Sequence, residues 1–216
     1  MELILASGSP RRRELIKNCG YEFTVVPSRA EEKARGGSPR KLASELAAGK
    51  AMDVFLSLPK ERRGGAAVIG SDTVVALGGK LLGKPADAEE AKAMLRMESG
   101  RENRVSTGLC VIAPAAALKE EPGAPISVSR FTAEGTEAVM LSACDTARVR
   151  FAKLADEEIE EYVRSGDPLD KAGAYGIQGA FSAHIESVSG SYFTVVGLPV
   201  HLLYRMLSSL GIARKL

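Results

Sequence analysis

Signals for short apolar strands and for amphipathic helices alternate along most of this sequence. Residues 3–6 and 66–69 are short apolar runs, typical of buried strands. A serine followed by a proline at residues 9–10 and again at 38–39 combines an N-cap residue with a favoured first helical residue, which predicts helices that begin there. Because strands and helices interleave, the sequence predicts an α/β fold with a central mixed sheet flanked by helices.

Two later stretches are less regular. Residues 113–144 are rich in Ala, Pro, Gly, Ser and Thr with little periodicity, so we expect a long loop or a poorly ordered insertion there. Residues 181–188 and 192–196 resemble a pair of strands joined around Gly190. The chain shows no internal repeat and no linker between two cores, so we expect a single domain over residues 1–216, with 113–144 as a loop insertion.

The charge balance argues against several classes of protein. The 216 residues include 29 Lys and Arg against 27 Asp and Glu, so no broad positive field favours nucleic acid as a partner. No apolar run approaches the roughly 20 residues that span a bilayer, and the first residues lack the features of a signal peptide. The three cysteines form no CxxC pair, which argues against a disulfide framework or a zinc site. We expect a cytoplasmic protein that captures any anionic ligand locally.

The sequence SGSPRRR at residues 7–13 follows a strand and begins a helix. A helix N-terminus presents backbone N–H groups and a positive dipole end, which together bind anions. Guanidinium groups match phosphate oxygens in bidentate fashion, and about two of the three arginines can face one ligand at roughly 100° per residue. The motif is neither GxxxxGK[ST] nor GxGxxG, so a solvated basic helix start stays open as the alternative.

Asp72 lies in the sequence GSDT at residues 70–73, directly after a buried strand. The carboxyl ends of strands are where α/β sheets usually bind ligands. A carboxylate there can hold a divalent cation or accept a proton from water. A turn-forming aspartate is an equally good interpretation of this residue alone.

Other polar candidates lie on predicted loops and on a helix. Lys84 follows a predicted hairpin, and residues 170–179 combine glycines and alanines with Lys171, Tyr175 and Gln178. Small residues allow close approach of the backbone to a ligand, and an amide can read a base edge. A solvated lysine and a small-residue turn are the structural alternatives. The available residue types favour hydrolysis by metal-activated water over a covalent nucleophile.

In this order, the motifs closely resemble the Maf family of nucleoside triphosphate pyrophosphatases. The matching sequences are LASGSPRR at 5–12, GSDTVV at 70–75, GKP at 83–85, KAGAYGIQG at 171–179 and VGLP at 196–199. The resemblance runs from about residue 3 to 210, and only residues 113–144 are longer than is usual in the family. It implies a Maf/inosine-triphosphatase-like α/β fold with a cleft between two lobes, usually as a homodimer.

The resemblance also implies a reaction and the residues that support it. Family members cleave a nucleoside triphosphate between the α- and β-phosphates, with a divalent cation, Mg²⁺ or Mn²⁺. Asp72 matches the proton-accepting aspartate, and we expect Glu32 and Asp72 to hold the metal. The positions associated with phosphate or metal binding are matched by Ser9, Arg11, Arg12, Glu32, Lys50 and Lys84. Arg11, Thr73 and Gln178 match positions linked to base choice.

Thr73 and the sequence AYGIQG at 174–179 resemble the branch that hydrolyses dTTP and UTP, not the branch that prefers 7-methyl-GTP. We therefore predict a nucleotide-pool house-cleaning enzyme for pyrimidine triphosphates, including CTP or modified pyrimidines. One departure is Asn103, where the family commonly has a histidine. A nucleotide-binding regulator of cell division with little turnover is the alternative, and a nucleic-acid-binding module is disfavoured by the balanced charge and few aromatic residues.

Overall fold

The computed structural model of the chain describes residues 1–30 and 37–215. The chain forms two compact units. The first unit comprises Met1–Asp72, Thr107–Cys144 and Gly197–Leu216, and the second comprises Thr73–Ser106 and Asp145–Val196. The single domain expected over residues 1–216 stays a prediction.

The described strands belong to one mixed sheet, as the sequence predicts. Their order is β2-β1-β3-β5-β7-β6, with β4 paired to β3 and β8 paired to β7. β1 pairs in parallel with β2 and β3, whereas the β3–β4, β6–β7 and β7–β8 pairs are antiparallel. The strands are β1 (Glu2–Leu5), β2 (Thr24–Val25), β3 (Ala66–Leu77), β4 (Lys80–Leu82), β5 (Glu102–Pro114), β6 (Ser127–Ala133), β7 (Thr136–Phe151) and β8 (Ile185–Ser189).

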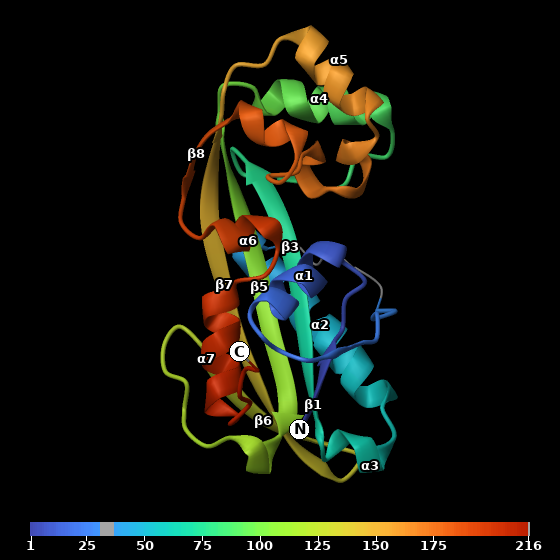
Figure 1. The fold of residues 1–216 in the computed structure, drawn as a ribbon, viewed down its shortest axis with the longest axis vertical. Helices are drawn as coiled ribbons and strands as arrows, with labels where there is room; N and C mark the ends of the chain where they lie inside the picture. The colour runs from blue at the N-terminus through green and yellow to red at the C-terminus, as the bar shows by residue number, and fades with distance from the viewer. Residues whose placement is uncertain (31–36, 216) are drawn as a thin grey trace. The chain divides into compact units, whose positions relative to one another are not determined.

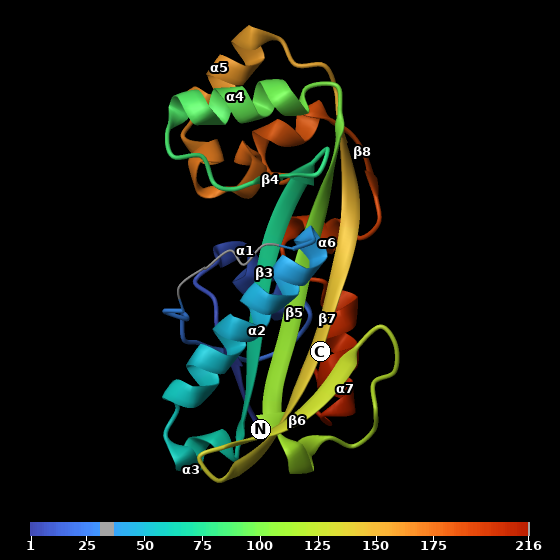
Figure 2. The same cartoon turned by 180° about the vertical axis from the view of Figure 1, so that it is seen from behind.

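In the first unit, helices lie on both faces of the strands. Figure 2 shows α2 on one face, and Figure 1 shows α1 and α7 on the other. The predicted serine–proline starts are confirmed, because α1 begins at Pro10 and α2 at Pro39, where the Ser38 side chain accepts a hydrogen bond from the backbone N–H of Lys41. The helical segments of this unit are α1 (Pro10–Asn18), α2 (Pro39–Ser57), α3 (Lys60–Arg63), η1 (Ala115–Ala117) and α7 (Val200–Ser209).

Helix α2 approaches the sheet unusually closely because alanines on the helix meet glycines on the strands. A Cβ atom added to Gly70 in β3 would lie 2.2 Å from the backbone oxygen of Ala47, and one added to Gly108 in β5 would lie 2.1 Å from that of Ala43. Both alanines are fully buried. This contact fixes the height of α2 above β3, and it therefore sets the reach of every polar side chain on that face of the helix.

A pair of glycine substitutions tests this close approach. Gly108→Ala is expected to lower the free energy of unfolding by about 2–3 kcal/mol, because the added methyl group overlaps helix backbone that has no room to move. Gly49→Ala, in the same helix α2 but with no atom within 4 Å of its added Cβ, is expected to stabilise by up to about 1 kcal/mol. Urea denaturation measures both, and an unchanged midpoint for Gly108→Ala would contradict the packing.

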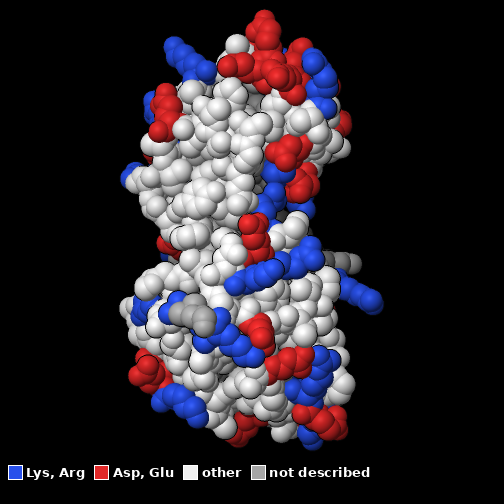
Figure 3. All heavy atoms as spheres, in the orientation of Figure 1, with Lys and Arg blue, Asp and Glu red and all other residues white. Residues whose placement is uncertain are grey.

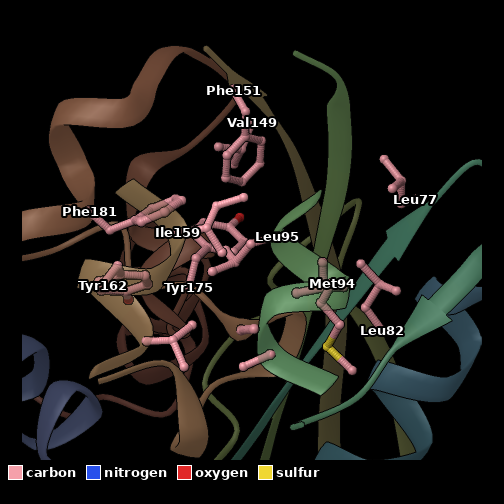
Figure 4. Close-up of a cluster of buried hydrophobic side chains, with 14 of the residues drawn as sticks. Leu77, Leu82, Met94, Leu95, Val149, Phe151, Ile159, Tyr162, Tyr175 and Phe181 are labelled. Atoms are coloured by element: carbon pink, nitrogen blue, oxygen red, sulfur yellow. The ribbon is translucent and has the colours of Figure 1, made fainter. Parts of the chain in front are cut away.

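The second unit is built around an aromatic cluster (Figure 4). The ring centroids of Phe151 and Tyr175 lie 4.8 Å apart in an edge-to-face arrangement, and those of Tyr162 and Phe181 lie 4.6 Å apart. The side chain of Asp87 caps α4, because it accepts a hydrogen bond from the backbone N–H of Glu90. The helical segments are α4 (Ala88–Glu98), α5 (Asp156–Arg164), η2 (Asp167–Asp170), η3 (Ala172–Ala174), η4 (Ala180–His184) and α6 (Tyr192–Val196).

The expectation of a loop over residues 113–144 is wrong for most of its second half. β6 and β7 form a hairpin in register from Ser127↔Ser142 to Ala133↔Thr136, with Glu134 and Gly135 in the left-handed turn conformation. Several inward positions of β7 are alanines, such as Ala143 and Ala147, which obscure the alternation of apolar and polar residues that marks a strand.

The strand pair expected at 181–188 and 192–196 is also wrong in large part. Only Ile185–Ser189 forms a strand, residues 180–184 form the short helix η4, and residues 192–196 form helix α6. In α6 the buried Thr194 donates its hydroxyl to Asp145, a contact made on the far strand β7. Tertiary contacts of this kind override the β propensity of the sequence YFTVV.

Among the described residues, no helix is both long enough and apolar enough to cross a membrane. On the face drawn in Figure 3, acidic and basic side chains alternate in small groups. This view agrees with the near balance of charge along the sequence. An anionic ligand would therefore be bound by individual basic residues and not by a broad positive surface.

Candidate functional site

The register of β1 and β3 brings the first arginine motif beside the Asp72 motif. These parallel strands pair from Glu2↔Ala66 to Leu5↔Ile69, and the N–H of Ala6 donates to the carbonyl of Ile69 over 2.8 Å. β1 then ends, whereas β3 continues to Leu77, so Asp72 lies within a continuous strand and not after its end as expected. The β1–β3 pairing ends at Leu5 and Ile69. The loop at residues 7–9 therefore lies next to residues 70–72 of β3.

Lys50 and Asp72 form the central ion pair of this region. Lys50 Nζ lies 2.5 Å from Asp72 Oδ1, and the two side chains are only 15% and 11% exposed. The pair follows from the packing of α2, because Ala51 lies against Gly70 and so places the preceding residue, Lys50, over Asp72. The sequence reasoning named both residues, but only the structure joins them.

Arg12 braces the start of α1 against the end of the site. Its Nε donates to the carbonyl of Gly197 over 2.8 Å, and its Nη1 donates to Ser7 Oγ over 3.1 Å. Ser71 Oγ lies 3.0 Å from both the Gly197 and the Gly108 carbonyl oxygens. Three segments far apart in sequence therefore meet at one carbonyl, directly beside Asp72. Arg12 is predicted to bind phosphate, and in this structure two of its guanidinium nitrogens donate hydrogen bonds within the protein.

The sequence reasoning missed Ser7, Ser71 and Gly197 as site residues. All three are buried, and all three fall inside the motifs already identified. The signal for Ser71 is a small polar residue that directly follows a buried apolar run, since a buried hydroxyl needs a partner. Gly197 takes part through its backbone carbonyl, so its residue type does not identify it as a site residue.

Ser9 and Arg11 are both half-buried and lie at the N-terminus of α1. Ser9 is the N-cap residue of α1, yet its side chain makes no capping hydrogen bond, and its backbone N–H donates to Ser7 Oγ over 3.3 Å. The hydroxyl of Ser9 therefore does not occupy the amide groups of the first turn. Arg11 is half-buried and Arg13 is exposed, and how many of the three arginines face a ligand stays a prediction.

Glu32, the second predicted metal ligand, lies outside the described residues. Across residues 1–30 and 37–215, no cluster of three or more His, Cys, Asp or Glu side chains is close enough to hold a metal ion. Asp72 is thus the predicted metal ligand that the structure places, and its donor atoms are carboxylate oxygens, which suit hard divalent cations.

In the second unit, the loop of Lys84 and the segment of Gln178 are joined by their backbones. The N–H of Gly173 donates to the carbonyl of Gly83 over 3.0 Å, one residue before Lys84. Lys84 and Gln178 are exposed, and Thr73 is half-buried at the start of the unit. Lys84 and Gln178, two of the three predicted substrate-binding residues of this unit, therefore lie on adjoining loops.

The other polar residues of the segment have structural partners. Lys171 is buried, and its Nζ donates to the backbone oxygen and Oδ1 of Asp167 and to Oδ1 of Asp170 over 2.5–2.8 Å. Tyr175 is buried in the aromatic cluster. Of the three side chains that suggested a ligand-binding loop, Gln178 alone is exposed in the structure.

Chemically, the first unit combines a carboxylate, a neighbouring ammonium group, an arginine and a helix N-terminus. The cations and the helix end suit phosphate oxygens, and the carboxylate suits a proton or a metal ion. Positioning and charge neutralisation are the main requirements of phosphoryl substitution.

Comparison with known proteins gives a consistent family relationship. A family model described as Maf-like protein matches residues 2–210. The dTTP/UTP pyrophosphatase of Deinococcus radiodurans is 44% identical over 211 residues, which is 98% of this chain and 94% of that protein. The dTTP/UTP pyrophosphatase of Thermococcus gammatolerans is 42% identical over 204 residues, 94% of each chain. That of Aquifex aeolicus is 40% identical over 212 residues, 98% of this chain and 97% of the other.

Proposed function

Because the chain belongs to the Maf family of Maf-like proteins, we propose that it is a nucleoside triphosphate pyrophosphatase that acts on dTTP and UTP. The products are the nucleoside monophosphate and pyrophosphate. The observation that carries the proposal is the contact of Lys50 with Asp72 beside the N-terminus of α1. We propose that CTP and triphosphates with modified pyrimidine bases are further substrates.

In the proposed reaction, a water oxygen forms a bond to the α-phosphorus. The bond from that phosphorus to the oxygen bridging to the β-phosphorus breaks, and pyrophosphate leaves with that oxygen. Asp72 accepts the proton of the water, and Lys50 orients the carboxylate through Oδ1. Arg11 and the first-turn amides of α1 neutralise phosphate charge that the substrate brings to the site.

A divalent cation, Mg²⁺ or Mn²⁺, is part of the proposal. Asp72 is the described residue that would hold it, together with Glu32, and the remaining ligands would be phosphate oxygens and water, as is usual for Mg²⁺. An all-oxygen donor set suits either ion. When bound, the ion supplies a Lewis acid that withdraws charge from the phosphate oxygens.

Thr73, Lys84 and Gln178 are assigned to the substrate on the basis of the resemblance. Lys84 is proposed to bind phosphate, and Thr73 and Gln178 to select the base together with Arg11. An amide can donate to the 4-oxo group and accept from the N3–H of thymine or uracil, whereas the cytosine edge presents the opposite pattern. The homodimer and the cytoplasmic location stay predictions, and light scattering of the purified chain measures the first.

A panel of nucleotides tests the proposed function. Pyrophosphate release is measured for dTTP, UTP, CTP and 7-methyl-GTP with Mg²⁺ and, separately, with Mn²⁺. We expect release from dTTP and UTP at kcat/KM at least tenfold above that for 7-methyl-GTP. Equal rates on all four nucleotides would overturn the assignment to the dTTP/UTP branch. Tight nucleotide binding without any release would instead support the nucleotide-binding regulator.

A further inference from the structure

Three polar side chains meet inside the core of the second unit, and none of them is assigned to the reaction. Glu98 and Asn103 are fully buried, and Tyr175 is 6% exposed. Asn103 Nδ2 donates to Glu98 Oε1 over 2.6 Å and lies 3.3 Å from the hydroxyl of Tyr175. Within the described residues, Glu98 Oε2 is buried without a hydrogen-bond partner.

Burying this cluster in the core costs folding free energy, because Glu98 is an ionisable group. Glu98 is the last residue of α4, where the negative end of the helix dipole disfavours a carboxylate. Burial raises the pKa of Glu98 to about 8, and the hydrogen bond from Asn103 lowers it only in part. No lysine or arginine of the described chain forms an ion pair with Glu98, and Tyr175 is the titratable group that faces it. Burial, and secondarily the charge of Glu98, raises the pKa of Tyr175.

The cluster packs against a strained backbone segment at residues 173–174. Gly173 and Ala174 both adopt left-handed backbone angles, with φ of 77° and 58°, which is unfavourable for alanine. A Cβ added to Gly173 would lie 3.4 Å from Glu98 Oε1, so the carboxyl group lies directly against this turn. The ring of Tyr175 then enters the aromatic cluster, and the N–H of Gly176 donates to the hydroxyl of Tyr162 over 3.1 Å.

The same segment carries Gln178, one of the residues proposed to contact the nucleotide. Gln178 follows Tyr175 by three residues, and the backbone of Gly173 is bonded to the carbonyl of Gly83 beside Lys84. A displacement of Tyr175 therefore moves the loop that bears Gln178 and loosens its connection to the loop that bears Lys84.

We propose that Glu98, Asn103 and Tyr175 form an internal clasp that positions Gln178 and thereby governs the choice between pyrimidine bases. The clasp rests on the proposed function, because base choice has meaning only for a nucleotide-hydrolysing enzyme. None of the three residues touches the nucleotide in this proposal. They are positioning residues that act through the backbone of residues 173–178.

Two variants of the full chain test the clasp, one that removes the hydroxyl group and one that removes the amide. Tyr175→Phe removes one oxygen, and Asn103→Leu replaces the amide by an apolar group of similar size. We expect each variant to change the ratio of kcat/KM for dTTP over dCTP at least threefold, since these substrates differ at the base edge that Gln178 reads. The double variant is expected to change the ratio no more than the larger single change, because both remove the same clasp.

The control is Ile159→Val, which trims the same aromatic-lined core without touching the clasp. Its melting temperature is compared with that of Tyr175→Phe, and its dTTP/dCTP ratio is expected to stay within 1.5-fold of the unmodified protein. An unchanged ratio in Tyr175→Phe, or an equal change in Ile159→Val, would overturn the clasp while the proposed function stands. Loss of pyrophosphate release in the unmodified protein itself would overturn the proposed function, and the clasp with it.

Discussion

Asp72→Asn is expected to lower kcat for pyrophosphate release from dTTP by about 10²–10⁴-fold, the range typical for loss of a general base. The amide keeps the size of the carboxylate and retains an oxygen that accepts from Lys50, so the packing of α2 on β3 is preserved. It cannot accept the proton of the attacking water. Initial rates at saturating nucleotide with Mg²⁺ measure the effect, and circular dichroism confirms that the variant is folded.

The matched control is Asp156→Asn, which removes the same charge at the exposed start of α5, where Asp156 pairs with Arg96. Its kcat is expected within twofold of the unmodified protein. If Asp72→Asn also stayed within threefold, Asp72 would not be the proton acceptor, and the water would have to be activated by another group. A drop of equal size in both variants would point to a general effect of charge.

The elements nearest the predicted site follow from local sequence. The serine–proline starts of α1 and α2 are chemical signals within a few residues, and the structure confirms both. The β1–β3 pairing follows from two apolar runs that each precede a polar motif. These signals place Ser9 and Arg11 at the start of α1, whereas Asp72, expected directly after a strand, lies inside the longer β3.

The contacts between those elements do not follow from local sequence. Lys50 reaches Asp72 only because α2 rests on Gly70, and a glycine within a strand reveals nothing about which helix will cover it. Ser71 and Arg12 meet at the carbonyl of Gly197, about 125 residues further along the chain than Ser71. Long-range backbone contacts of this kind carry no residue-type signature.

Two further features were hidden from sequence reasoning. Lys171 was a candidate ligand-binding charge beside the alternative of a small-residue turn, and in the structure it pairs with Asp167 and Asp170. Its burial is decided by the turn geometry, which a list of residue types omits. The β6–β7 hairpin was obscured because alanines occupy inward positions of β7, and alanine is poor evidence for either a strand or a loop.

Glu98→Gln is expected to stabilise the protein by an amount that grows with pH. The pKa of Glu98 is raised from its usual 4.5 to about 8 in the folded chain, mainly by burial. Below pH 4.5 the side chain is neutral in both states, and the substitution changes little. Between pH 4.5 and 8 the unfolded chain loses the proton while the folded chain retains it, so the unmodified protein loses stability as pH rises. At about 1.4 kcal/mol per pKa unit, the advantage of glutamine approaches roughly 5 kcal/mol near pH 8 and then stays level.

Urea denaturation at pH 5 and at pH 8.5 measures this difference, and Glu161→Gln on the exposed face of α5 is the matched control. The control is expected to change the free energy of unfolding by less than about 0.5 kcal/mol at both pH values. A Glu98→Gln advantage that is equal at pH 5 and pH 8.5 would show that Glu98 does not carry a buried neutral carboxyl. Because glutamine retains the oxygen that accepts from Asn103, the dTTP/dCTP ratio of Glu98→Gln is expected to stay unchanged, which separates the cost of the buried acid from the clasp it completes.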